Sequence, residues 1–196
     1  TWREAEPVPA ARPAAPAEVQ VSEGPAVRVI ERDIPQSIIM LMARGIKRDD
    51  PDYFPLFVGN YILGGSGFTS RITEEVRQKR GLAYSVFSSL STYRDTGAVT
   101  IYAGCANDAV GELVDVVMAE VRRLKAEPLV AGELRRAKDH LKGSLMLGLE
   151  STSSRMTHLA RQEIYGDTGE SLDDMLVAID AVTDAVLRQF GVTRVD

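Results

Sequence analysis

Cysteine is almost absent from this chain, because Cys105 is the single cysteine among 196 residues. A disulfide bond within the chain and a cysteine-based metal cluster are therefore excluded. Cys105 follows Gly104 at the end of an expected strand, where a packed, inert side chain is more common than a nucleophile. This one thiol leaves the redox compartment undetermined.

Histidine is scarce as well, with His140 and His158 as the two representatives. Neither belongs to a His-x-x-x-His or His-x-x-Glu-His arrangement. A catalytic zinc usually takes three protein ligands from histidine, cysteine and carboxylate. We therefore predict no zinc site in this chain and expect both histidines to be ordinary packed or solvated side chains. A Gly-x-Ser-x-Gly nucleophile elbow is also absent, which disfavours a serine hydrolase.

Neither a long apolar run nor an excess of positive charge marks the chain. No stretch of about 18 apolar residues is present, so we predict no membrane-spanning helix. The net charge of −5 disfavours nucleic acid as a partner. No amino-terminal segment resembles a signal peptide. The chain begins with threonine, so we expect a fragment of a longer protein, whose compartment, bacterial periplasm or cytoplasm, stays open.

Proline is concentrated at the amino end of the chain. Four of the nine prolines lie within residues 1–17, among alanines and glutamates. This composition is typical of a semi-rigid, extended spacer. Because a spacer joins two folded parts, it is the first hint of a second domain upstream. We predict an interdomain linker over residues 1–26 and one folded domain over residues 27–196.

Two apolar segments near the start of that domain predict strands. Residues 38–43 (Ile-Ile-Met-Leu-Met-Ala) form an unbroken apolar run that favours a buried central strand. A further strand is expected over residues 27–34, and residues 191–196 are a weak candidate for a last strand.

Alternation over residues 84–93 and 97–103 predicts a β-hairpin, with a turn between the two runs. In its first strand we expect Tyr84, Val86 and Leu90 on one side and Phe87 on the other. The second strand is expected to place Val99, Ile101 and Ala103 together on one side.

The remaining segments predict helices. Residues 52–63 follow a helical pattern that a glycine run ends, and residues 69–80 form the next helix with Gly81 as its terminator. Further helices are expected over residues 108–125, around Leu134 to Leu145, around Met156 to Ile164, and over residues 173–190. This order predicts an α+β fold: a two-layer sandwich of a mostly antiparallel sheet with helices on one face.

Several separated motifs carry a specific resemblance. They are Leu63-Gly64-Gly65, Ser70-Arg71-Ile72, Glu75-Val76-Arg77, residues 79–85 (Lys-Arg-Gly-Leu-Ala-Tyr-Ser), Asp95-Thr96-Gly97, Tyr102-Ala103-Gly104, Leu141-Lys142-Gly143, Leu149-Glu150-Ser151, and Arg155-Met156 before residues 159–163. In this order they resemble the carboxy-half signature of the pitrilysin family of zinc peptidases, which includes insulin-degrading enzyme and the mitochondrial processing peptidase. The likeness runs from Ile34 to Thr183.

The resemblance implies a pair of homologous domains around an enclosed chamber. An upstream domain or a partner subunit would carry Zn²⁺ on a His-x-x-Glu-His motif. This chain would contribute an arginine and, seven residues later, a tyrosine that hold the substrate backbone. That spacing selects Arg77 and Tyr84, whereas Arg80 has the wrong spacing. Substrate peptides in the family lie extended against a sheet edge, which makes few demands on their sequence.

The side chains of Arg77 and Tyr84 can both donate hydrogen bonds to a substrate backbone. A guanidinium donates several fixed hydrogen bonds to peptide carbonyls, and a tyrosine hydroxyl can donate to a carbonyl oxygen that gains charge. From the spacing alone, a solvated helix charge at Arg77 and a half-buried strand aromatic at Tyr84 would be the simpler interpretation. The surrounding motif favours the functional one.

The glycine segment Gly64, Gly65, Ser66 and Gly67 has two interpretations. A glycine-rich loop before a helix can bind phosphate, but no Lys-Ser/Thr pair accompanies it as in a P-loop. We expect contact with a peptide, or a simple break between helices.

The leading hypothesis is therefore the substrate-binding half of a zinc metalloendopeptidase that degrades or processes unstructured peptides. Its partner would be a homologous zinc-bearing domain or subunit, in a homo- or heterodimer. A catalytically silent scaffold subunit related to the processing peptidase is the alternative. A free-standing peptide-binding module is the third hypothesis.

Overall fold

The computed structural model describes residues 33–165 and 171–187. From Ile34 onward they belong to one compact unit. The expected linker over residues 1–26, nearly all of the expected strand over 27–34 and the candidate strand over 191–196 lie outside the described residues and stay predictions.

Three antiparallel strands form a sheet in the order β1-β3-β2. Their bounds are β1 (Gln36–Arg44), β2 (Ala83–Thr92) and β3 (Gly97–Ala106). β2 and β3 form the predicted hairpin, and the main-chain nitrogen of Tyr93 donates to the carbonyl of Thr96 at 2.8 Å in its turn. β1 runs antiparallel along the other side of β3, with Leu41 opposite Ile101.

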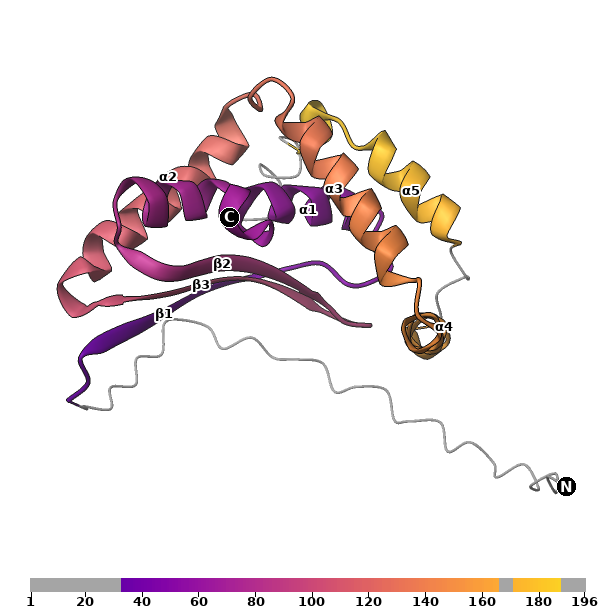
Figure 1. Ribbon diagram of the computed structural model, residues 1–196, viewed down its shortest axis with the longest axis horizontal. Helices are drawn as coiled ribbons and strands as arrows, with labels where there is room; N and C mark the ends of the chain where they lie inside the picture. The colour runs from indigo at the N-terminus through magenta and orange to yellow at the C-terminus, as the bar shows by residue number, and fades with distance from the viewer. Residues whose placement is uncertain (1–32, 166–170, 188–196) are drawn as a thin grey trace, which may run out of the picture. The chain divides into compact units, whose positions relative to one another are not determined.

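Helices form the second layer, and Figure 1 shows α1, α2 and α3 on the same side of the sheet. The predicted α+β sandwich with helices on one face is therefore confirmed. No helix in the described part of the chain is long and apolar enough to cross a membrane. The helical elements are α1 (Tyr53–Asn60), η1 (Tyr61–Gly65), η2 (Gly67–Thr69), η3 (Thr73–Lys79), η4 (Asn107–Ala109), α2 (Val110–Ala126), α3 (Glu133–Gly148), α4 (Thr152–Tyr165) and α5 (Leu172–Ala181).

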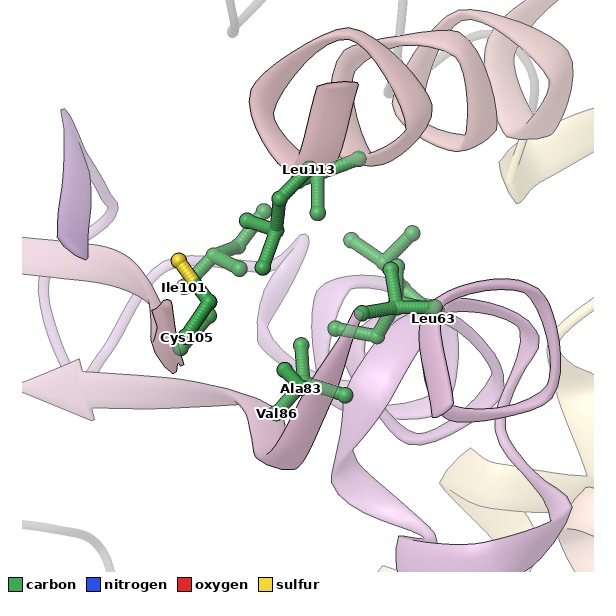
Figure 2. Close-up of a cluster of buried hydrophobic side chains, with 10 residues drawn as sticks. Leu63, Ala83, Val86, Ile101, Cys105 and Leu113 are labelled. Carbon is green, nitrogen blue, oxygen red and sulfur yellow. The ribbon is translucent and has the colours of Figure 1, made fainter. Parts of the chain in front are cut away.

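The main core lies between the sheet and the helices, because each strand turns alternate side chains to the helical layer. Cys105 is a buried member of this core, as predicted for a packed thiol. Full burial of a valine, leucine or isoleucine side chain contributes about 1.5–3 kcal/mol to stability. Figure 2 shows the side chains of Leu63, Ala83, Val86, Ile101, Cys105 and Leu113 gathered in this cluster.

β1 differs from its prediction. Ile39 and Leu41 pack against the core, but Ile38, Met40 and Met42 are 68%, 58% and 66% exposed. The prediction of a buried central strand is wrong within the described residues, because β1 lies at the edge of the sheet and helices cover one face of it. An unbroken apolar run does not distinguish a strand covered on one face from a strand covered on both.

α4 is present as predicted, yet the side chains that predicted it are uncovered. Met156, Leu159 and Ile164 are each more than 60% exposed in the described structure. Gln162 is the buried residue among the described side chains of this helix. α4 therefore contributes little to the core that the described residues form.

Gly64 marks a close approach of the helical layer to β2. A Cβ atom at this position would lie 2.4 Å from Ile72 Cδ1 and 2.6 Å from the main-chain nitrogen of Ser88. Because that nitrogen belongs to the sheet, we expect Gly64→Ala to lower the free energy of unfolding by about 1–3 kcal/mol. Urea unfolding measures this change.

Gly111→Ala is the matched control for this variant. Gly111 lies in α2, where a Cβ atom would meet no atom within 4 Å. Alanine there should leave stability equal or raise it by up to about 1 kcal/mol, because alanine is the better helix former. Equal stability of the Gly64→Ala and parent chains would contradict the close approach.

Candidate functional site

Arg77 and Tyr84 lie on either side of one tight turn. η3 ends at Lys79, and the chain reverses through Gly81, whose φ of +66° favours glycine. The main-chain nitrogen of Leu82 donates back to the carbonyl of Val76 at 2.9 Å, which closes the turn. Since Val76 is fully buried, this bond fixes the end of the helix relative to the sheet.

A β-bulge at the start of β2 turns Tyr84 away from the core. The pairing of β2 with β3 shifts register between Ala83 and Ser85. As a result Ala83 and Val86 both face the core, while Tyr84 is 83% exposed. The expectation that Tyr84 shares a side with Val86 is wrong, because the bulge inserts one residue into the alternation.

The guanidinium of Arg77 stacks on the ring of Tyr84. Its Cζ atom lies 4.4 Å from the centroid of that ring and 4.7 Å from the centroid of the Phe68 ring. Cation–π contacts of this kind use the face of each ring and leave the hydrogens of the guanidinium free. Within the described residues neither the guanidinium of Arg77 nor the hydroxyl of Tyr84 has a hydrogen-bond partner. Both groups are therefore available to a ligand.

Arg80, the competing arginine, is committed to Glu75. It donates to the Glu75 carboxylate and, at 3.1 Å, to the main-chain carbonyl of the same residue. Arg80 lies five residues after Glu75. A π-helical turn such as the one in η3 places residues at this spacing on the same side of the helix. Lys79 Nζ lies 2.6 Å from the other carboxylate oxygen. Hydrogen bonds from Lys79 and then Arg80 hold the pKa of Glu75 below its usual range.

The glycine segment divides into two parts in the structure. Gly64 is buried and packs against β2, as described above. Gly65 and Gly67 are exposed and Ser66 is partly buried, so these three residues border the surface near Phe68. Gly67 has a φ of +63°, a backbone conformation that is strained for residues with a side chain. Contact of this segment with a peptide stays a prediction.

Phe68 is the member of this group that the sequence did not reveal. It lies on η2 and is 66% exposed. Phe68 is a large aromatic residue in a glycine-rich loop that has no other apolar residue to bury it. This pattern could have indicated an exposed, functional ring. The sequence separation of nine residues from Arg77 fits no simple helical or strand period.

The described residues contain no group of three histidine, cysteine, aspartate or glutamate side chains that could hold a metal ion. His140 lies on α3, where its Nδ1 is 3.3 Å from Ser144 Oγ, and His158 lies on α4. These donors do not fit a catalytic zinc, so no step of zinc chemistry is assigned to the described residues.

Two cavities in the described chain lie away from the arginine–tyrosine pair. One of about 490 Å³ is bordered by β1, α1 and α2, with Leu41 and Val121 in its wall. Another of about 460 Å³ is bordered by Tyr53, Tyr93 and Arg161. Arg77 and Tyr84 line neither of these cavities.

Comparison with known proteins identifies the family. Residues 3–141 match the family described as the peptidase M16 inactive domain. The chain belongs to this family. The resemblance to the pitrilysin-type zinc peptidases is thereby confirmed, and the carboxy-terminal, inactive type of M16 domain is the one that matches.

Individual relatives agree with this assignment. An uncharacterized zinc protease of Streptomyces coelicolor is 37% identical over 177 residues, which is 89% of this chain and 38% of that protein. The chain thus spans less than half of the relative it matches. A peptidase M16 inactive domain from Pseudomonas fluorescens superposes with a TM-score of 0.76 at 27% identity, over 88% of this chain and 44% of the other.

A more distant neighbour shows the fold alone. It is a chain of Complex III2 from Candida albicans, with a TM-score of 0.73 at 21% identity, over 84% of this chain and 41% of that chain.

Proposed function

We propose that this chain is the substrate-binding half of a zinc metalloendopeptidase that acts on unstructured peptides. The zinc motif would lie on an upstream domain of the same parent protein or on a partner subunit of a homo- or heterodimer. One observation carries the proposal: Arg77 and Tyr84 lie stacked on an open surface, with their polar groups unoccupied within the described residues. The name of the Streptomyces relative, a zinc protease, supports the same activity.

The two side chains would divide the work on the substrate. Arg77 donates from the edge of its guanidinium to carbonyl oxygens of an extended peptide, which holds the backbone in place. Tyr84 donates its hydroxyl hydrogen to the scissile carbonyl oxygen as that oxygen gains charge in the tetrahedral intermediate. Hydrolysis would also require the zinc ion of the other half, which would activate the attacking water.

Arg77→Ala in the parent protein tests this proposal. Loss of hydrogen bonds from a charged donor is expected to lower kcat/KM about ten- to hundredfold, mainly through KM. Arg80→Ala is the matched control, because Arg80 lies in the same turn but pairs with Glu75. Peptide cleavage by both variants, with circular dichroism to verify folding, measures the effect. Equal activity of the two variants would refute the role of Arg77.

A scaffold subunit without activity is the second candidate. The exposed apolar residues Ile38, Met40 and Met42 favour it, since such a face suits a permanent partner. The fold does not discriminate, because the Complex III2 chain shares it. Capture of the native parent protein, followed by zinc analysis of the complex, separates the two candidates. One zinc with peptidase activity supports the first, and no zinc with no activity supports the second.

A further inference from the structure

We propose that Phe68 is a positioning residue for substrate binding, which acts by holding the guanidinium of Arg77 from the side opposite Tyr84. The proposal rests on the proposed function of Arg77 and adds a third residue to it. Phe68, Arg77 and Tyr84 come from three different elements, η2, η3 and β2.

The geometry is that of a two-ring clamp. The Cζ atom of Arg77 lies 4.7 Å from the Phe68 centroid and 4.4 Å from the Tyr84 centroid. Each ring contacts the same cation, while the two rings make no ring contact with each other in the described chain. A planar guanidinium covered on its faces presents its N–H groups along its edge, which is the direction that suits carbonyl oxygens.

The backbone beneath Phe68 is anchored from two directions. The side-chain amide of Gln78 donates to the carbonyl of Phe68 at 2.7 Å. The hydroxyl of Ser70, which is fully buried, lies 2.8 Å from the carbonyl of Gly67. Phe68 therefore has a fixed main chain and an exposed ring. Such a ring adds little to core packing, so its contact with Arg77 is its main structural role.

The acidic side chains beside Arg77 form no ion pair with it in the described structure. Glu74 and Glu75 lie on the same helical segment as Arg77, and a free arginine side chain could turn towards them. Lys79 pairs with both carboxylates and Arg80 with Glu75, so these acids are already occupied. The two rings then hold Arg77 outward. With one ring removed, the side chain samples more rotamers and binds substrate less often in the correct pose.

Kinetics of two Phe68 variants in the parent protein test the clamp. Phe68→Leu keeps apolar bulk but removes the π face, and we expect KM to rise about three- to thirtyfold with kcat unchanged. Phe68→Tyr keeps the face and should retain the parent KM. In an Arg77→Ala background, Phe68→Leu should cause no further loss, because its effect passes through Arg77.

A second readout does not depend on activity. In parent protein labelled with ¹⁵N-arginine, the Nε–Hε resonance of Arg77 should carry a ring-current shift that falls in Phe68→Leu and persists in Phe68→Tyr. An unchanged resonance in Phe68→Leu would overturn the clamp. A KM loss from Phe68→Leu that persists beside Arg77→Ala would also overturn it, because Phe68 would then act on substrate directly.

The outcomes separate the two proposals. If Arg77→Ala raises KM and Phe68→Leu does not, the clamp is refuted and the function of Arg77 stands. If Arg77→Ala itself leaves kinetics unchanged, the proposed function fails, while the resonance shift still reports whether the clamp exists.

Discussion

Replacing Tyr84 by phenylalanine in the parent protein is expected to lower kcat about a hundred- to a thousandfold, the usual effect of removing one donor to a developing oxyanion. The variant deletes a single hydroxyl that has no partner within the described residues, so the fold should not change. The ring remains to stack on Arg77, and KM should therefore stay close to that of the parent. A loss confined to kcat is the signature of a contact made in the transition state.

Tyr93→Phe is the control for this experiment. Tyr93 lies on the same hairpin and is also exposed, and the hydrogen bond that closes the turn uses its main-chain nitrogen. Cleavage of an unstructured peptide under saturating substrate gives kcat for both variants. Full activity of Tyr84→Phe would remove the tyrosine from the mechanism.

Replacing Glu133 by glutamine is expected to lower the free energy of unfolding by about 3–5 kcal/mol, because it leaves a buried charge without its partner. Arg71 binds Glu133 through two hydrogen bonds, Nε to Oε1 at 2.8 Å and Nη2 to Oε2 at 2.7 Å. Their side chains are 11% and 17% exposed. The Nη1 atom of Arg71 is buried without a hydrogen-bond partner in the described structure, and apart from Glu133 the negative charge of Glu120 also acts on this cation.

The same pair gives a pH dependence with a definite sign. Burial alone would raise the pKa of Glu133, but the hydrogen bonds and charge of Arg71 outweigh it and hold that pKa below its usual range. A lowered folded-state pKa means that the stabilisation is complete above the unfolded value of about 4.3 and is lost as the pH falls through the folded value. Urea unfolding between neutral and acidic pH should show a larger loss in the parent chain than in Glu133→Gln, which keeps the contribution of other carboxylates with a lowered pKa, such as Glu75.

A double variant distinguishes an unpaired charge from lost packing. Arg71→Met combined with Glu133→Met removes both charges and keeps apolar volume, so it should be more stable than Glu133→Gln alone. If the double variant is instead the less stable of the two, the ion pair itself stabilises the fold and our explanation is wrong.

Much of this fold follows from short-range patterns in the sequence. The β2–β3 hairpin and α2 show the regular alternation or helical period that their burial on one side requires. Gly81 marks the end of η3 because its backbone needs a positive φ. The family resemblance, and not the seven-residue spacing by itself, selected Arg77 and Tyr84, and the structure places the Cζ atom of Arg77 4.4 Å from the centroid of the Tyr84 ring.

The features that escaped prediction depend on the whole fold. The bulge before Ser85 adds one residue to β2, and no residue type in the sequence signals it. Strict alternation therefore predicted the wrong side of the strand for Tyr84. Arg71 and Glu133 are 62 residues apart, and no local pattern joins them. Residues 38–43 are apolar throughout, but which side of that strand is covered depends on helices that come later in the chain.

The bulge between Ala83 and Ser85 also assigns core packing and surface chemistry to different residues of β2. Ala83 and Val86 carry the packing of this part of β2, so position 84 is released from any volume requirement of the interior. Tyr84 can therefore be exchanged for other amino acids with little risk to folding. Variants with every other amino acid at position 84 should therefore differ in activity and not in stability. Their activities would measure which side chain the surface site requires.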